Sequence, residues 1–353
     1  MTFMTNTSSL IGQFGRTADG HEAALYTLRN DRLQVRMTDF GGRIVSIEAP
    51  DRTGRRQHIL LGFDDVAEYA SAGGSFGALL GRSANRIAGG CFTLDGHTYE
   101  LSRNDGDSTL HGGAVGFDKV FWRVDAFDAA QLVLKHVSPD GDQGFPGQLS
   151  VHATYRLEDH SLSLTLEAET TKATPVSLSA HPYFNLAGLP AGDILGHEIM
   201  IEADAFLPTD AKQIPTGEIR QVHGTPFDFR RSVPAGARIR EADPQLLYGK
   251  GYDHCFVLKI GDQTTPRLAA RARHPESGRV LEIFTTQPGT QFYTGNNLNG
   301  SVAGRDGAYR QSAGFAFEPQ GFPNAPNQAT FPTTVLRPGS TYREVIRYQF
   351  TTD

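Results

Sequence analysis

Apolar and polar residues alternate with a period of two in the middle of the chain. Between residues 149 and 157 the apolar positions include Val151, Ala153 and Tyr155. A polar turn follows at residues 158–160 (EDH), and the alternation resumes over residues 161–168 (SLSLTLEA). Successive side chains of a strand point to opposite faces, so two such runs around a short polar turn predict a β-hairpin.

The same kind of reading predicts more strands but few helices. Further strands are expected at residues 131–137 (QLVLKHV), 279–284 (RVLEIF) and 342–350 (YREVIRYQF). The 39 glycines and 19 prolines fall mostly between such runs, as expected for many strands joined by tight turns. Helical periodicity is weak, and we expect only short helical turns near residues 65–72 and 241–247.

These elements predict an all-β protein, a large antiparallel β-sandwich of two broad sheets packed face to face. The chain contains no Ser/Gly or Pro tract, no low-complexity block and no repeat of fixed period. We therefore expect one domain over residues 1–353, with residues 1–15 loosely ordered. A β-barrel or a propeller is the alternative, and the missing repeat argues against a propeller.

Composition and charge exclude several classes of function. The formal net charge of -6 comes from 33 basic and 39 acidic residues, and Arg230 and Arg231 form only a short basic pair, so we expect no nucleic-acid partner. Apolar runs such as residues 59–63 are too short to cross a bilayer, so we expect no membrane association. Two isolated cysteines and an N-terminus without a secretory pattern predict a cytoplasmic protein.

Two residues with acid–base chemistry precede prolines at the ends of strand-like runs. His181 follows residues 175–180 and precedes Pro182, and Glu318 follows Phe317 and precedes Pro319. A residue before proline is held out of the helical region, which gives its backbone a stiff, extended conformation. Such stiffness suits a catalytic acid or base, but on the residues alone a histidine bonded to a carbonyl and a glutamate paired with an arginine are the better interpretation.

Other candidate residues lie in Gly-rich or aromatic segments. Arg82 or Arg86 could hold a hydroxyl group, and His111 before two glycines suggests a tight turn. Asp253 and His254 are adjacent, so on a strand they would point to opposite faces, and no spacing typical of a metal site is present. No phosphate-binding glycine loop of the form G-x-x-x-x-G-K-[ST] occurs.

Taken together, these segments resemble the aldose 1-epimerase family from about residue 42 to residue 350. The strings that carry the resemblance, in chain order, are GRSANRI, LHGG, GFDKVFW, SPDGDQGFPG, HPYFNLAG, GYDHCF, TTQPGTQFYTGN, GFAFEPQGFPNAPN and LRPGSTY. One string alone is weak evidence, whereas nine in the order of the family form a specific pattern.

The resemblance implies the galactose mutarotase-like supersandwich fold and an enzyme that interconverts the α and β anomers of free hexoses without a cofactor or metal. It implies that His181 is the general acid and Glu318 the general base. It also implies a set of residues that contact the sugar: Asn85, Arg86, His111, Tyr183, Asp253 and Gln287. We expect a monomer, and the preferred sugar stays open.

Two alternatives remain at this point. An epimerase for hexose 6-phosphates would share the architecture but would need additional basic residues near C6 of the sugar. A catalytically silent sugar-binding domain could keep Asp253, Arg86 and the aromatic residues while losing the acid–base pair.

Overall fold

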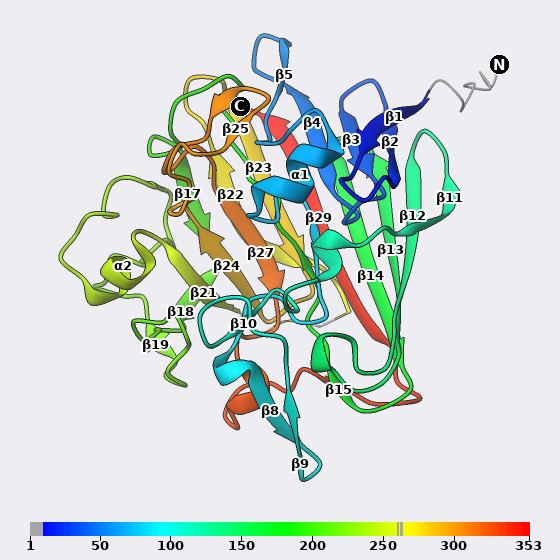
Figure 1. Ribbon diagram of the computed structural model, residues 1–353. Helices are drawn as coiled ribbons and strands as arrows, with labels where there is room; N and C mark the ends of the chain where they lie inside the picture. The colour runs from blue at the N-terminus through cyan, green and yellow to red at the C-terminus, as the bar shows by residue number, and fades with distance from the viewer. Residues whose placement is uncertain (1–9, 260, 262–263) are drawn as a thin grey trace.

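A computed structural model describes residues 10–259, 261 and 264–353. The largest sheet in this part of the chain is antiparallel and has nine strands (Figure 1). The strands are, in sheet order, β11 (Arg123–Phe127), β12 (Gln131–Ser138), β13 (Leu149–Glu158), β14 (Ser161–Thr170), β29 (Tyr342–Thr352), β23 (Arg279–Thr285), β22 (Arg267–Arg273), β17 (Glu198–Ile201) and β20 (Val233–Pro234). The hairpin predicted from alternation is β13–β14, and the strands predicted at residues 131–137, 279–284 and 342–350 are β12, β23 and β29. These predictions are confirmed.

A second sheet of five strands carries much of the candidate site. In sheet order it comprises β19 (Arg220–Gln221), β18 (Ala203–Phe206), β21 (Asp253–Leu258), β24 (Gly289–Tyr293) and β27 (Ala316–Gln320). Every residue of β24 and β27 is buried, so both faces of these two strands are covered. On one face Phe292 stacks on Phe317 with ring centroids 5.0 Å apart, within the large hydrophobic core.

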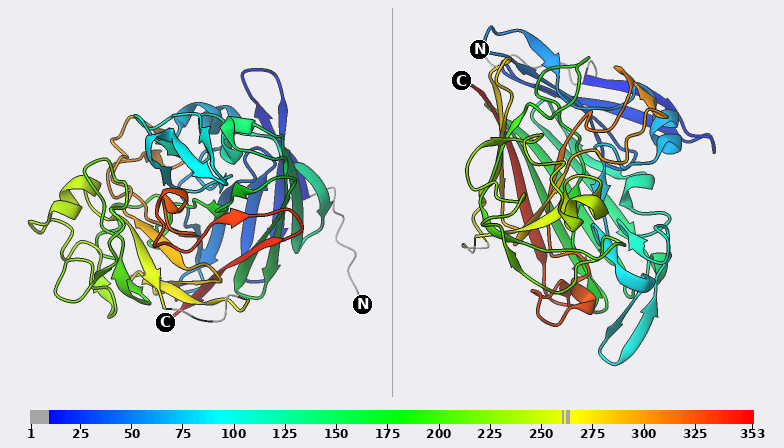
Figure 2. Two further views of the ribbon diagram at one scale, coloured as in Figure 1. Left: turned by 90° about the horizontal axis from the view of Figure 1, so that it is seen from below. Right: turned by 90° about the vertical axis from the view of Figure 1, so that its left-hand side faces the viewer.

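A third sheet is formed near the N-terminus by β1 (Ile11–Arg16), β2 (Glu22–Arg29), β3 (Gln34–Thr38), β4 (Ile44–Pro50) and β5 (Arg56–His58). Figure 2 (right) shows this sheet, in blue, lying across one end of the nine-stranded sheet. The expectation of a loosely ordered segment over residues 1–15 is wrong for its last part, because β1 pairs with β2 from Ile11 onward. Residues 1–9 of that segment lie outside the described residues.

The short helices are found close to where they were expected. α1 (Val66–Ala72) begins after Asp65, whose side chain accepts a hydrogen bond from the Ala67 N–H, and α2 (Pro244–Gly249) begins in the same way after Asp243. In the part of the chain that the structure describes, no helix is both long and apolar enough to cross a membrane.

The run before His181 differs from the prediction of one continuous strand. It forms two short strands, β15 (Thr174–Pro175) and β16 (Ser179–Ala180), which pair with different partners. β15 pairs with β28 (Val335–Leu336), whereas β16 pairs with β6 (Leu79–Leu80). His181 follows β16 directly.

Candidate active site

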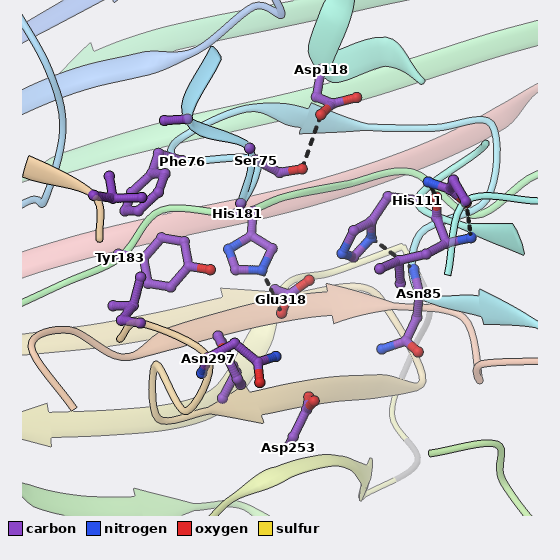
Figure 3. Close-up of a pocket in the computed structure, with 18 of the residues that line it drawn as sticks. Ser75, Phe76, Asn85, His111, Asp118, His181, Tyr183, Asp253, Asn297 and Glu318 are labelled. Carbon is purple, nitrogen blue, oxygen red and sulfur yellow. Dashed lines mark hydrogen bonds and ion pairs between the residues drawn. The ribbon is translucent and has the colours of Figure 1, made fainter. Parts of the chain in front are cut away.

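A pocket of about 420 Å³ opens beside the second sheet and collects most of the predicted site residues. Asp253 and Glu318 come from β21 and β27, and Arg86 comes from β7 (Arg86–Ile87). His111 follows β10 (Thr109–Leu110), and His181 follows β16. Figure 3 shows His181 and Glu318 pointing toward one another within this pocket. Other lining residues include Asn85, Tyr183, Tyr293 and Asn297.

Strand register explains why the acidic groups face the pocket. Gln291 of β24 lies opposite Glu318 on one side and opposite Cys255 on the other. Because side chains opposite each other in paired strands share a face, and residues two apart in one strand do too, Asp253 lies on the same face as Glu318. The other face carries Phe292 and Phe317, which pack in the core. The face with Asp253 and Glu318 therefore lines the pocket, and the opposite face packs in the core.

His181 and Glu318 form a buried pair at the centre of the pocket. The His181 Nε2 atom lies 3.4 Å from Glu318 Oε1, and the two side chains are only 6% and 3% exposed. His181 Nδ1 and Glu318 Oε2 have no hydrogen-bond partner within the protein. Buried polar atoms are normally bonded, so these two atoms are exceptions, and they belong to two residues that line the pocket.

Burial shifts the pKa values of both members of the pair in the direction of their neutral forms. Burial lowers the pKa of His181 to about 4. Burial also raises the pKa of the Glu318 carboxyl well above its usual range, and the nearby Asp253 charge adds to that shift. Between these two pKa values the pair holds one proton, and the two shifts favour the state with a protonated Glu318 and a neutral His181.

The Tyr183 ring covers one side of the His181 imidazole. The two rings are stacked with centroids 4.6 Å apart, and the His111 ring meets His181 edge-on at 5.6 Å. Aromatic neighbours of this kind limit the rotation of the imidazole and keep water away from it. His181 is therefore held in one orientation toward Glu318.

His111 stands in the tight turn that the two following glycines predict. Its backbone is left-handed, with φ of 51°, and Gly112 follows with φ of 92°. A Cβ atom at Gly112 would lie 1.9 Å from the carbonyl oxygen of Gly81, so only glycine fits there. Burial lowers the pKa of His111 well below its usual value, and the positive charges of neighbouring groups add to the effect. His111 is therefore neutral.

Asp253 and Arg86 belong to one hydrogen-bonded chain at another part of the pocket wall. Asp253 accepts hydrogen bonds from Gln291 at 2.7 Å and from Gln213 at 2.8 Å. Arg86 donates to Gln213 at 3.0 Å and forms an ion pair with Asp105 at 2.7 Å. Burial raises the pKa of Asp253, whereas the charge of Arg86 and the two amide donors lower it. These donors favour the ionised carboxylate.

Two further expectations about neighbouring residues can be compared with the structure. His254 is buried between Phe227 and Phe206, away from the pocket that Asp253 lines, as strand alternation predicts. Arg82, considered beside Arg86, is buried and donates to the backbone carbonyls of Pro139, Pro146 and Gly147, so its role is structural.

The side chains of His111, His181 and Glu318 are the one group of the described residues close enough to hold a metal ion, with ligand atoms within 4.8 Å of one another. However, His111 Nδ1 accepts a hydrogen bond from the Asn85 backbone N–H at 3.1 Å. The proton of the neutral ring then resides on Nε2, the nitrogen that a metal in the pocket would need. The arrangement suits a hydrogen-bond donor better than a metal ligand.

Comparison with known proteins agrees with this geometry. The sequence profile of the family described as aldose 1-epimerase matches residues 24–349. The chain belongs to the aldose 1-epimerase family. A galactose mutarotase from Sus scrofa is 45% identical over 326 residues, covering 92% of this chain and 93% of the relative. An aldose 1-epimerase from Escherichia coli (strain K12) is 37% identical over 337 residues, covering 94% and 96%.

Solved structures show the same fold. A GalM/aldose epimerase homologue from C. elegans superimposes with a TM-score of 0.86 at 28% identity, covering 94% of this chain and 99% of that one. A galactose 1-epimerase from Lactobacillus acidophilus gives a TM-score of 0.84 at 27% identity, covering 97% and 98%. Members of the aldose 1-epimerase family are carbohydrate epimerases of the isomerase class, and their all-β sandwich is the architecture found here.

The structure corrects one residue that the family resemblance placed in the site. Gln287 lies away from the pocket, where its amide donates to Tyr342 at 2.8 Å and to Glu344 at 2.6 Å. Within the same string TTQPGTQFYTGN, the glutamine that reaches Asp253 is Gln291, four residues later. Gln287 lies in the turn between β23 and β24, whereas Gln291 lies within β24 beside Glu318. The strand pairing that separates the two glutamines is not visible in the sequence.

Proposed function

We propose that this aldose 1-epimerase family member interconverts the α and β anomers of free aldohexoses, with Glu318 as the general base and His181 as the general acid. The observation that supports the proposal most is the buried pair itself, 3.4 Å apart with free Nδ1 and Oε2 atoms. Anomer exchange needs one proton acceptor and one proton donor close to the same sugar, and this pair supplies both.

The proposed reaction starts from the state in which the single proton of the pair is on His181. Glu318 removes the proton from the hydroxyl on C1 while His181 protonates the ring oxygen. The C1–O5 bond breaks, and the electron pair of the former O1–H bond forms the aldehyde. Rotation about C1–C2 presents the other face of the carbonyl group. Closure returns the proton of Glu318 to O1 and the proton of O5 to His181, so the pair ends with the single proton with which it began.

The remaining pocket residues hold the sugar in this proposal. Asn85, Arg86, His111, Tyr183 and Asp253 line the pocket with hydrogen-bonding groups around the acid–base pair. A neutral polyhydroxyl ligand is recognised by such converging donors and acceptors, and fixing its orientation accounts for a large share of catalysis.

The charges of the pocket favour a free sugar over a sugar phosphate. Its basic side chains are Arg86 and Lys119, and Arg86 is already paired with Asp105. Lys119 is exposed and donates to the Ala114 carbonyl oxygen. The acidic side chains of Asp118 and Asp253 line the same pocket and would repel a phosphate dianion.

Polarimetry tests the proposal directly. Freshly dissolved α-glucose and α-galactose should reach their equilibrium rotation faster with the wild-type protein than without it, in proportion to its concentration. Glucose 6-phosphate should show little acceleration. Equal acceleration of the phosphate ester would favour the hexose 6-phosphate alternative, and no acceleration of any sugar would favour a silent binding domain.

We also propose that the protein acts as a monomer in the cytoplasm, in hexose and specifically galactose metabolism, without nucleic-acid or membrane partners. The two cysteines, Cys91 and Cys255, are free thiols, which fits a reducing compartment. The spread of the acidic residues and the net charge of -6 fit the absence of a polyanionic partner.

A further inference from the structure

We propose that Gln213 is a positioning residue for sugar binding, because its amide joins Arg86 to Asp253 and sets the direction of both groups. This inference rests on the proposed function, since it assigns a role in binding the same sugar. Gln213 lies outside the strings that carry the family resemblance, and it acts through its two partners.

The chemistry of the two partners fixes the orientation of the amide. Asp253 offers carboxylate oxygens to the Gln213 Nε2 group at 2.8 Å, and Arg86 can only donate, which it does to Gln213 Oε1 at 3.0 Å. A glutamine amide satisfies an acceptor and a donor at the same time, which no apolar or singly charged side chain of this length can do. Gln213 is thus a neutral link between two opposite charges.

This link keeps the two charged groups separate. The ion pair of Arg86 is with Asp105, and the second oxygen of Asp253 accepts from Gln291. Without the amide between them, the guanidinium and the Asp253 carboxylate would be free to pair directly. Such a pair would turn both groups toward each other and away from the sugar hydroxyls, so binding would weaken although no sugar contact had been removed.

The loop that carries Gln213 is built without help from its side chain. The backbone N–H of Gln213 donates to the Asp210 carbonyl oxygen, and the Asp210 side chain accepts from the N–H groups of Lys212 and Ile214. The Gln245 side chain accepts a hydrogen bond from the Thr209 backbone N–H at 2.7 Å and donates one to the Thr209 carbonyl oxygen at 2.8 Å. A change of the Gln213 side chain should therefore leave the loop folded.

A neighbouring residue on the same loop provides a matched control. Lys212 forms an exposed ion pair with Asp107 at 2.7 Å, which ties the loop to the segment that carries Asp105. Exposed pairs contribute little to stability, so its loss should be tolerated. Lys212→Met removes this attachment of the loop and keeps the Gln213 amide, whereas Gln213→Met removes the amide and keeps the length of the side chain. Comparing the two variants shows which of the two contacts sugar binding depends on.

Gln213→Asn is a second probe, because the backbone at this position is left-handed with φ of 62°. Asparagine tolerates this conformation better than most residues, yet its amide is one methylene group too short to reach both partners. An Asn variant should therefore keep the fold and lose the link. Agreement between the Asn and Met variants would exclude a backbone effect.

The experiment measures KM and kcat for mutarotation together with calorimetric binding of 1,5-anhydrogalactitol, which has no anomeric hydroxyl. For Gln213→Met and Gln213→Asn we expect KM and the dissociation constant to rise about tenfold, the factor that corresponds to ~1.4 kcal/mol. The value of kcat should stay within about threefold, because the acid–base pair is intact. Lys212→Met should bind the anhydro sugar as the wild type does.

The double variant with Arg86→Lys separates positioning from a general loss of stability. If Gln213 acts through Arg86, adding Gln213→Met to Arg86→Lys should weaken binding less than about twofold further. Wild-type affinity in Gln213→Met, an equal loss in Lys212→Met, or fully additive losses in the double variant would overturn the inference. A wild-type protein that binds the anhydro sugar but does not accelerate mutarotation would refute the proposed function alone.

Discussion

The backbone N–H of Asn85 donates a hydrogen bond to Nδ1 of His111 at 3.1 Å. This contact assigns the tautomer of a neutral imidazole whose pKa is well below its usual value. The proton resides on Nε2, so His111 presents a fixed N–H donor at the edge of the His181 ring. In the proposed reaction this donor can bind a sugar oxygen beside the acid–base pair without taking part in proton transfer.

His111→Asn tests this role while preserving the turn. The Asn side-chain oxygen can replace Nδ1 as the acceptor for Asn85, and asparagine tolerates the left-handed backbone. The variant lacks the Nε2–H donor, so we expect kcat/KM to fall about 10- to 100-fold, with a melting temperature within a few degrees of the wild type. Unchanged kcat/KM would show that the donor does not contact the substrate.

Arg86 should not be replaceable by lysine. Its guanidinium donates in two directions, to Asp105 through Nε and to Gln213 through Nη2. An ammonium group lacks this planar geometry and cannot make both contacts from the same position. We expect Arg86→Lys and Arg86→Ala to weaken sugar binding and lower the rate together, with kcat/KM reduced at least about tenfold. Steady-state polarimetry measures both constants, and a Lys variant with wild-type constants would contradict this account of the contacts.

A pair of glycine substitutions tests the packing behind His111. In Gly112→Ala the new Cβ would overlap the Gly81 carbonyl oxygen, whereas Gly96, also at positive φ, has no atom within 4 Å of the added Cβ. Gly96→Ala should cost about 1 kcal/mol from backbone strain alone, and Gly112→Ala should cost several times more. Urea unfolding measures both. Equal losses would show that the turn around Gly112 can adjust.

Activity should have an acidic limb set by His181. Because burial lowers its pKa to about 4, the imidazole binds a second proton of the pair only as the pH falls through that value. A doubly protonated pair has no acceptor, so kcat/KM should stay level from pH 7 to about 5 and fall near pH 4. The profile is measured by polarimetry after subtraction of the spontaneous rate, with circular dichroism to show that the protein stays folded. An acidic limb near 6.5 would contradict the buried environment.

Much of the fold could be predicted because one-sided burial leaves a period-two pattern, as in β13 and β14. β24 and β27 gave no such signal, since both faces of these strands are buried and no residue is exposed to mark the period. The break between β15 and β16 was also invisible, because it depends on which strands lie alongside each segment.

Part of the site could be predicted, because most of its residues lie in the sequence strings that resemble the family. His181 and Glu318 could be named, but their separation depends on how β16 packs beside β27. Gln287 and Gln291 lie in one string, and only the pairing of β24 with β21 and β27 shows which one reaches Asp253. Gln213 lies on a loop with no periodic pattern, so its two contacts could be found only in three dimensions.

The most direct test of the central claim is polarimetry of freshly dissolved α-glucose with Glu318→Gln, beside the wild type and Glu282→Gln. Glu282 lies on β23 and pairs with Arg271, so its variant controls for the loss of a carboxylate elsewhere. We expect Glu282→Gln to match the wild type and Glu318→Gln to lose about 10²- to 10⁴-fold in kcat, leaving little beyond the spontaneous rate. A folded Glu318→Gln protein with near-normal activity would contradict the assignment of the catalytic base.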